Sequence, residues 1–112
     1  MEEAQRMEVD LDNVTVKNNE GARRYEAQIE GHRASIAYQR TGDRIIFTHT
    51  EVPEALEGHG IAAKLAHTAL EDARAQHLTV IPLYPFVASY IRNHMEYSTL
   101  VPPDSRERVL GN

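Results

Sequence analysis

The hydrophobic pattern of this chain changes its period once, across a glycine-rich segment near the middle. Before Val52, apolar residues alternate with polar ones, which is the period of half-buried β-strands. From Gly60 to Gln76, apolar residues recur at helical spacing instead. The segment between them, Glu57-Gly58-His59-Gly60, must therefore carry the backbone from a strand directly into a helix.

Four strands in meander order are predicted before this change of period. They cover about residues 14–17, 25–30, 33–38 and 44–52, with turn residues such as Gly31 and Thr41-Gly42-Asp43 between them. Residues 1–9 are expected to form a frayed or edge-pairing start. Strict alternation along the fourth strand places one set of side chains on a single face, namely Ile45, Phe47, His49 and Glu51. The other face then carries Ile46, Thr48, Thr50 and Val52.

A fifth strand and a second helix are predicted after the long helix. Residues 78–83 form a short β-prone run, and Pro85 stands where a helix can begin. The order is therefore ββββαβα, an α+β fold whose mostly antiparallel sheet has one crossover. The length predicts a single domain over residues 1–112, with a core of about residues 9–97. Paired prolines and mixed charges predict a poorly ordered tail over residues 98–112.

The charge of the chain is concentrated at its start. The net charge of −5 comes from 17 acidic and 12 basic residues, and the first twelve residues hold five of the acids. The remainder is nearly neutral and has no basic stripe, so no binding to nucleic acid is expected. No apolar run approaches the ~20 residues of a membrane span and no signal peptide is recognisable, so we expect a cytoplasmic protein without membrane contact.

The chain contains no cysteine. Disulfide bonds, thiolate metal sites and a cysteine nucleophile are therefore excluded. The six histidines show neither an H-E-x-x-H pattern nor another metal-ligand spacing, so no metal is expected.

The segment Glu57-Gly58-His59-Gly60-Ile61-Ala62-Ala63 is the candidate binding motif. Its glycines let the backbone turn sharply beside a ligand, and the first turn of the helix presents unpaired N–H groups to an anion. A dinucleotide-binding fold is disfavoured because the chain has no acidic residue near Thr79-Val80, about twenty residues further on. The glycine spacing excludes a nucleotide P-loop. From the motif alone, a tight turn that binds nothing remains an alternative.

Two linked segments resemble the GCN5-related N-acetyltransferases. The first runs from Phe47 through the glycine motif to Leu65, and the second runs from Ile81 to Tyr97. Over about residues 14–97 the chain is similar to the minimal, YjdJ-like or NATD1-like members of this superfamily. The resemblance implies a small fold of this type, activity as an N-acetyltransferase, and acetyl-coenzyme A (acetyl-CoA) as the cofactor.

The resemblance also implies which residues hold the cofactor. Backbone amides of the glycine motif bind the pyrophosphate, which gives as cofactor-binding residues Gly58, His59, Gly60, Ile61, Ala62 and Ala63. The backbone near Val52 pairs with the pantetheine arm as an extra strand. Glu57 stands where the superfamily usually has Gln or Arg, and its carboxylate is expected to point away from the pyrophosphate.

Four residues are candidates for catalysis. Relatives often carry a cysteine where this chain has Tyr84, so the resemblance implies direct attack of an amine on the thioester, with an amide near Val52 stabilising the oxyanion. Tyr84 or Tyr90 can protonate the departing thiolate, since phenols titrate near pH ~10. His49, with Glu51 two residues away on the same strand, can accept the proton of the amine. Each of these side chains can instead have a purely structural role.

Three functions are compatible with the sequence. The leading hypothesis is transfer of an acetyl group from acetyl-CoA to a primary amine, either on a small molecule or on a protein lysine or N-terminus. The second is a coenzyme A (CoA)-binding module with weak or no catalysis that acts in sensing or partner binding, because the thiol of relatives is missing. The third is an α+β interaction protein whose glycine loop is empty.

Overall fold

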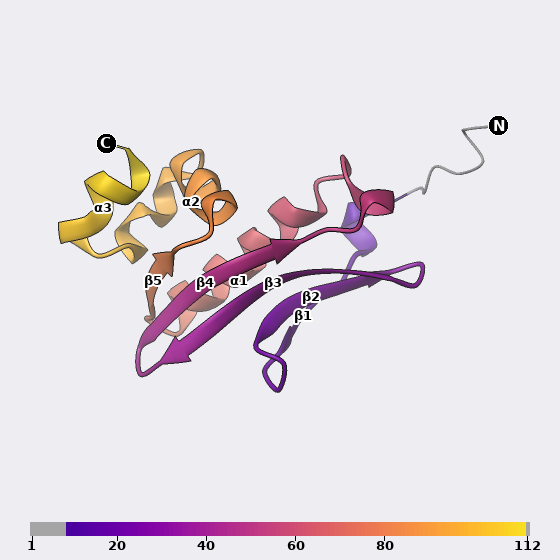
Figure 1. Ribbon diagram of the computed structural model, residues 1–112, viewed down its shortest axis with the longest axis horizontal. Helices are drawn as coiled ribbons and strands as arrows, with labels where there is room; N and C mark the ends of the chain where they lie inside the picture. The colour runs from indigo at the N-terminus through magenta and orange to yellow at the C-terminus, as the bar shows by residue number, and fades with distance from the viewer. Residues whose placement is uncertain (1–8, 112) are drawn as a thin grey trace.

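The computed structural model describes residues 9–111 (Figure 1). In this part of the chain, five strands form one sheet in sequence order: β1 (Val16–Asn19), β2 (Arg24–Ile29), β3 (His32–Thr41), β4 (Arg44–Glu51) and β5 (Thr79–Pro82). The first four strands are antiparallel neighbours, and β5 pairs with β4 in parallel. The predicted α+β fold with a mostly antiparallel sheet is confirmed.

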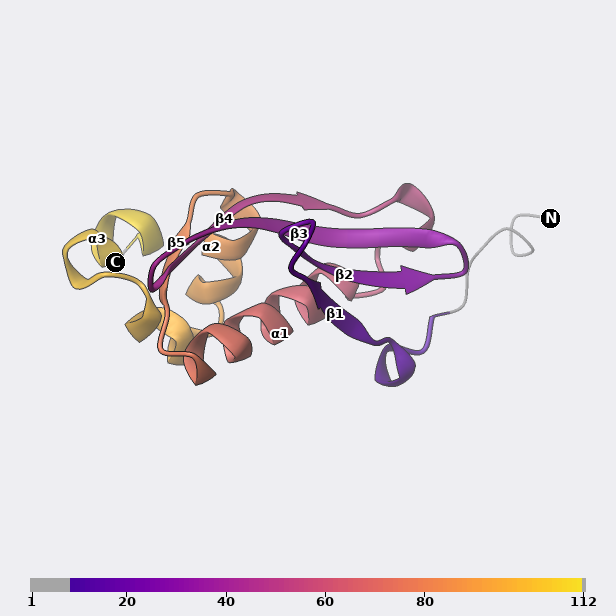
Figure 2. The same cartoon turned by 90° about the horizontal axis from the view of Figure 1, so that it is seen from below.

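The three α-helices lie in the second half of the described residues, and 3₁₀ turns occur in both halves. The elements are the α-helices α1 (Ile61–Ala75), α2 (Pro85–Arg92) and α3 (Pro103–Leu110), and the 3₁₀ turns η2 (Leu11–Asn13), η3 (Glu54–Leu56) and η4 (Met95–Leu100). Helix α1 is the crossover between β4 and β5 and lies across one face of the sheet (Figure 2). Within residues 9–111, no helix is long and apolar enough to cross a membrane. Residues 1–8 of the predicted frayed start lie outside the described residues.

One hydrophobic core lies between α1 and the sheet. The helix contributes apolar residues at helical spacing, all of them buried: Ile61, Leu65, Ala66, Ala69, Leu70 and Ala73. Strands β2 and β3 contribute alternate residues, and buried Tyr25 lies opposite buried Ile36. The Tyr25 hydroxyl also donates a hydrogen bond to Asp72 of α1 at 2.5 Å. Burial, reinforced by the Asp72 carboxylate, raises the pKa of Tyr25 above its ordinary value.

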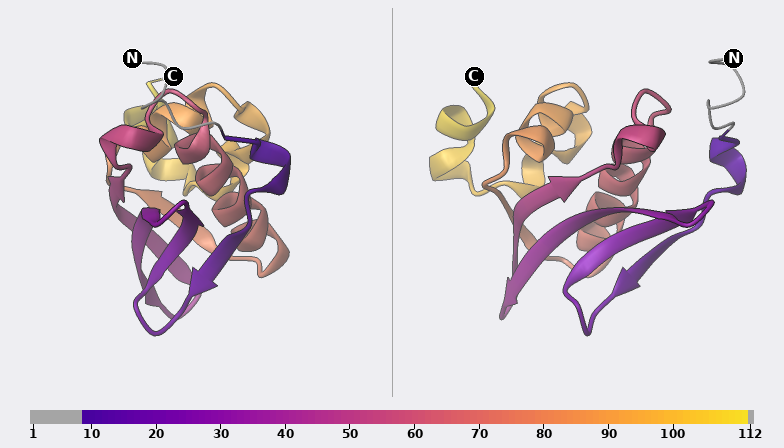
Figure 3. Two further views of the ribbon diagram at one scale, coloured as in Figure 1. Left: turned by 90° about the vertical axis from the view of Figure 1, so that its right-hand side faces the viewer. Right: turned by 45° about the vertical axis from the view of Figure 1, so that its right-hand side comes forward.

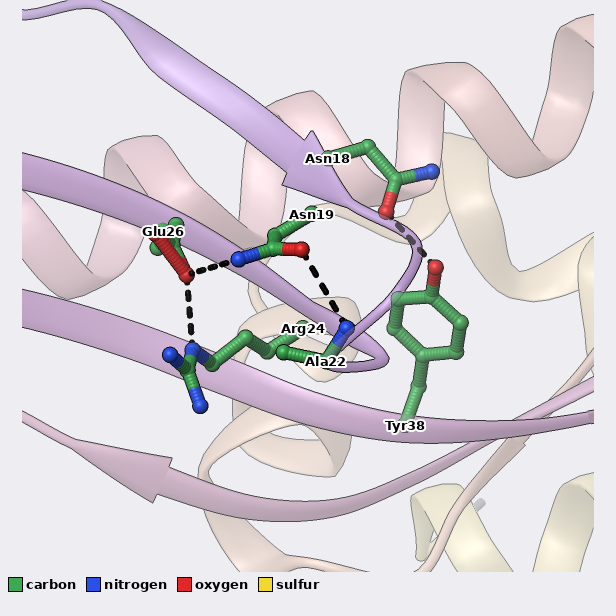
Figure 4. Close-up of polar contacts among 6 residues, drawn as sticks. All are labelled: Asn18, Asn19, Ala22, Arg24, Glu26 and Tyr38. Carbon is green, nitrogen blue, oxygen red and sulfur yellow. Dashed lines mark hydrogen bonds and ion pairs between the residues drawn. The ribbon is translucent and has the colours of Figure 1, made fainter.

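A short turn joins β1 to β2, and Asn19 holds it in place (Figure 4). The Oδ1 atom of Asn19 accepts a hydrogen bond from the N–H of Ala22 at 3.2 Å, and its Nδ2 donates to Glu26 at 3.1 Å. The preceding Asn18 accepts a hydrogen bond from the hydroxyl of Tyr38 at 2.6 Å. Both asparagines find partners across the sheet, and β1 extends to Asn19, two residues beyond its predicted end.

A β-bulge in β4 overturns the predicted assignment of its faces. Up to Phe47, which lies opposite Tyr38, the strand keeps a regular register with β3. The register then shifts, because Thr48 is an extra residue and His49 is the next to pair. Such an insertion displaces the alternation of side chains between the two faces by one position.

The bulge places Thr50, rather than His49, on the face of β4 that meets the core. Thr50 pairs with Ile36, which is fully buried, and opposite residues of an antiparallel pair share a face. His49 and Glu51 therefore lie on the other face, and both are exposed. The two residues do share a face as predicted, but their grouping with Phe47 is wrong.

The C-terminal residues also differ from their prediction. Residues 98–111 do not form a poorly ordered tail, because they complete η4 and build α3, and they bury Val101 and Leu110 in the common core. The guanidinium of Arg106 donates a hydrogen bond to the carbonyl oxygen of Val101 at 2.9 Å, which fixes the turn before α3. The second proline starts this helix rather than preventing it, because Pro103 stands in the first turn, where its missing N–H costs no hydrogen bond.

Candidate functional site

A pocket of about 240 Å³ lies where the end of β4, the glycine segment and the first turns of α1 and α2 come together. Its walls are formed by Val52, Leu56, Glu57, Gly58, Gly60, Ile61, Ala62, Ala63 and Phe86. Glu57 is the only residue of this set with an ionisable side chain. The pocket therefore presents mainly apolar groups and backbone to a ligand.

The amides at the start of α1 are available to such a ligand. The first hydrogen bond of the helix runs from the N–H of Lys64 to the carbonyl oxygen of Gly60, and no side chain of the described residues caps this end. The N–H groups of residues 61–63 therefore have no partner within the helix. Together with the positive end of the helix dipole, they suit a phosphate group.

Both glycines of the motif have positive φ angles, 84° at Gly58 and 78° at Gly60, which L side chains rarely adopt. A Cβ atom on Gly58 would meet no atom within 4 Å, so the space beside it is open. On Gly60 it would lie 3.2 Å from Cδ1 of Leu11 in η2. The Nζ of Lys64 donates a hydrogen bond to the carbonyl oxygen of Leu11, which holds η2 against the start of α1 (Figure 3).

Strands β4 and β5 part beside this pocket. Their ladder ends with Phe47 opposite Pro82, and the N–H of Tyr84 makes one further hydrogen bond to the carbonyl oxygen of Phe47 at 3.1 Å. Strand β4 continues to Glu51, and no other strand of residues 9–111 pairs with it on that side. Its backbone groups are therefore open to an extended ligand that reaches the pocket at Val52.

Comparison with known proteins identifies the family. The model of the GCN5-related N-acetyl-transferase family matches residues 24–100, more than half of the chain. The chain belongs to the GCN5-related N-acetyltransferase family. This membership confirms the resemblance predicted from the two linked segments.

The similar proteins include curated members from vertebrates. The chain is 38% identical to Protein NATD1 of Bos taurus over 82 residues, which cover 66% of the chain and 72% of the relative. It is 39% identical to Protein NATD1 of Homo sapiens over 74 residues, which cover 59% of the chain and 65% of the relative. The match to Protein NATD1 of Mus musculus, also 39% identical over 74 residues, covers 59% of the chain and 66% of the relative. In the human and mouse comparisons the chain thus spans just under two thirds of the relative.

Most of the residues predicted to hold the cofactor of this N-acetyltransferase fold line the pocket. They are Val52, Gly58, Gly60, Ile61, Ala62 and Ala63, whereas His59 is not part of the lining. Sequence reasoning missed Leu56 and Phe86, although Phe86 was recognisable as part of the apolar face of the second helix. Glu57, expected to point away from the site, is exposed but contributes to the pocket wall.

His49 and Tyr84, two of the candidate catalytic residues, pack together on the outer face of β4. Their ring centroids are 5.4 Å apart, and the ring planes are inclined at 79°. Tyr84 reaches this place as the N-cap residue of α2, and the bulge turns His49 outward. Glu51 is exposed on the same face, and the described structure gives it no hydrogen bond to His49.

The fourth candidate, Tyr90, belongs to a different cluster. Its ring stacks on that of His94 with centroids 3.9 Å apart and lies 6.3 Å from the ring of Tyr97. Burial, reinforced by nearby carboxylates, raises the pKa of the Tyr90 phenol above its ordinary value. The structure therefore does not bring Tyr90 together with the other three candidates.

A larger groove, of about 480 Å³, lies between α1 and the strands β1 and β2. Glu71 and Asp72 line it, and a hydrogen bond from the hydroxyl of Tyr97 to Glu71 lowers the pKa of that carboxyl. These carboxylates would repel phosphate groups, so the pocket at the glycine segment fits a polyanionic cofactor better. Among residues 9–111, no three His, Asp or Glu side chains gather as a possible metal site.

Proposed function

We propose that this protein is an acetyl-CoA-dependent N-acetyltransferase that passes the acetyl group directly to a primary amine. The observation that carries the proposal is the pocket at the end of β4, where unpaired helix amides lie next to an open strand edge. The amides suit a pyrophosphate, and the strand edge suits a pantetheine arm that pairs as an extra strand. Membership of the GCN5-related family supports the same cofactor.

The residues present fit this cofactor in two respects, and one side chain opposes it. Open space lies beside Gly58 where a Cβ would otherwise stand. Val52, Leu56 and Phe86 supply an apolar wall for the arm. The exposed Glu57 is the one unfavourable charge in the lining. When bound, acetyl-CoA would supply the acetyl group as an activated thioester.

His49 and Tyr84 are the groups proposed to move protons. His49 would accept the proton that an ammonium acceptor must lose before its nitrogen can attack. As the new C–N bond forms and the C–S bond breaks, Tyr84 would donate its phenolic proton to the departing sulfur, and the second proton that the nitrogen loses would restore the phenol. A backbone N–H of β4 near Val52 would stabilise the negative charge that develops on the carbonyl oxygen.

The acceptor amine is proposed to approach the outer face of β4. His49 and Glu51 are both exposed there, and the carboxylate of Glu51 would attract a cationic amine. An exposed site of this kind admits a small molecule as well as a lysine or N-terminus of another protein.

The proposal is tested by titrating the protein with acetyl-CoA while its melting temperature is followed, and then adding primary amines and measuring free thiol. A ligand present at a hundred times its Kd stabilises the native state by about 2.7 kcal/mol, which gives a clear shift for a domain of this size. A shift together with amine-dependent thiol release is the expected result. A shift without release from any amine supports the alternative, a CoA-binding module without catalysis, which the absence of a cysteine at position 84 favours. No shift at saturating acetyl-CoA overturns both.

A further inference from the structure

The hydroxyl of Thr50 is buried in β4 without a hydrogen-bond partner. Among the described residues, Thr50 Oγ1 is the only buried side-chain oxygen or nitrogen in this condition. A buried hydroxyl without a partner destabilises a folded protein, so such groups are rare and call for a physical explanation. The explanation here lies in the position of Thr50 relative to the pocket.

Thr50 lies on the path that an extended ligand would follow along β4. The bulge and the pairing with Ile36 put its side chain on the core face of the strand. Val52, two residues further on, shares this face and lines the pocket. Toward the other end, β4 and β5 part after Phe47. Thr50 therefore stands between the pocket and the point where the strands separate, next in sequence to His49.

We propose that Thr50 Oγ1 donates a hydrogen bond to a carbonyl oxygen of the acyl-carrying arm of the cofactor. This inference rests on the proposed function, because it requires acetyl-CoA to lie in the pocket. The pantetheine arm carries amide carbonyls, and the acyl group adds a thioester carbonyl at its end. Each is an acceptor, which is what an unpartnered hydroxyl needs. The hydroxyl is thus unsatisfied in the free protein and satisfied when the arm is bound.

Two substitutions separate the hydroxyl from the shape of the side chain. Thr50→Val keeps the branched shape that suits a strand and removes the hydroxyl, and Thr50→Ser keeps the hydroxyl and removes the methyl group. The melting temperature of each free protein is measured, together with its Kd for acetyl-CoA, for CoA and for adenosine 3′,5′-bisphosphate. The bisphosphate carries phosphates but no arm.

Thr50→Val is expected to change stability and affinity in opposite directions. The free variant melts at a higher temperature than the wild type, because no hydroxyl is left unsatisfied. Its affinity for acetyl-CoA falls about 3- to 10-fold, which corresponds to one lost hydrogen bond. The Kd for adenosine 3′,5′-bisphosphate stays unchanged, and Thr50→Ser binds all three ligands like the wild type. If Thr50→Val binds both acetyl-CoA and CoA more weakly, the acceptor of the hydrogen bond is an amide carbonyl of the arm. If it binds only acetyl-CoA more weakly, the acceptor is the thioester carbonyl.

Several outcomes overturn the inference. A lower or unchanged melting temperature of free Thr50→Val shows that the hydroxyl already has a partner in the folded protein. If the Kd of Thr50→Val for acetyl-CoA is unchanged, or if its Kd for adenosine 3′,5′-bisphosphate rises by the same factor, the hydroxyl does not bind the arm. If Thr50→Ser loses as much affinity for acetyl-CoA as Thr50→Val, the effect comes from the shape of the side chain and not from the hydroxyl. Failure of the proposed function is seen separately, since the wild type itself then binds no acetyl-CoA.

Discussion

The ring of Tyr84 packs edge-on against the imidazole of His49, with ring centroids 5.4 Å apart. The contact joins the residue before α2 to the outer face of β4, at the place where β4 and β5 part. The glycine-lined pocket begins at Val52, the residue that follows β4 and packs against the core. In the proposed mechanism, the cofactor therefore binds on the core side of β4, and proton transfer takes place on its exposed side.

Removing the phenol or the imidazole should lower turnover without lowering cofactor affinity. We expect Tyr84→Phe and His49→Gln each to reduce kcat at least about 10-fold, since general acid and base groups contribute about 10²- to 10⁴-fold. The Kd for acetyl-CoA should stay within about twofold of the wild-type value, because neither side chain lines the pocket. Tyr90→Phe is the comparison, because Tyr90 packs in a different cluster. Wild-type kcat in both of the first two variants would contradict the assigned roles.

A negative charge in the first turn of α1 should weaken cofactor binding while leaving the helix intact. Ala62 lines the pocket, and an acid at this position interacts favourably with the helix dipole. Ala62→Glu should therefore keep or raise the melting temperature of the free protein but increase the Kd for CoA at least about 10-fold. Ala62→Gln adds similar bulk without charge, and the difference between the two variants should shrink with added salt. Equal affinities at low salt would show that the phosphates bind elsewhere.

The hydrogen bond between Tyr25 and Asp72 should contribute to stability. It connects β2 to α1 at 2.5 Å, and the tyrosine is only 2% exposed. Tyr25→Phe leaves the carboxylate without this donor, so we expect the free energy of unfolding at pH 7 to fall by about 1–3 kcal/mol. Urea denaturation measures the change. An unaltered free energy of unfolding would mean that water replaces the phenol at no cost.

The C-terminal helix should be part of the cooperative core. Leu110 is 3% exposed and packs in the common cluster, whereas Leu83 is 67% exposed. We expect Leu110→Ala to lower the free energy of unfolding by about 2–5 kcal/mol and Leu83→Ala to change it by less than about 0.5 kcal/mol. Denaturant titration of both variants compares the same substitution in two environments. Similar small losses in both would show that α3 does not stabilise the fold.

Acid should weaken the turn between β1 and β2 through Glu26. Hydrogen bonds, first from Arg24 and then from Asn19, lower the pKa of this carboxyl below its ordinary value. A group whose pKa is lower in the folded state stabilises the fold above its unfolded pKa of about 4.3, and this contribution is lost as pH falls through the folded value. The wild type should therefore lose more stability than Glu26→Gln between about pH 5 and pH 3. Parallel pH curves for the two proteins would contradict this.

The single change of hydrophobic period accounts for much of what could be predicted from the sequence. Alternation before Val52 and helical spacing after Gly60 are local signals, and they gave β4, the glycine turn and α1 with nearly correct limits. The positive φ angles of Gly58 and Gly60 follow the same local logic.

The missed features depend on contacts between distant residues. Nothing in the order Phe47-Thr48-His49-Thr50 indicates that one residue is extra, because the bulge exists only in pairing with β3. The orientation of His49 and its contact with Tyr84 could therefore not be predicted. Likewise, α3 carries few apolar residues, and it is the burial of Leu110 against the rest of the core that distinguishes it from a tail.

The most direct test of the proposed site is to follow the backbone amide NMR signals of the protein during a titration with acetyl-CoA. The largest changes are expected in two stretches, residues 58–63 at the start of α1 and residues 48–52 along the open edge of β4. Saturable changes confined to these stretches would support acetyl-CoA as the ligand of this pocket. No change at saturating acetyl-CoA, or changes centred on the groove beside Asp72, would contradict it.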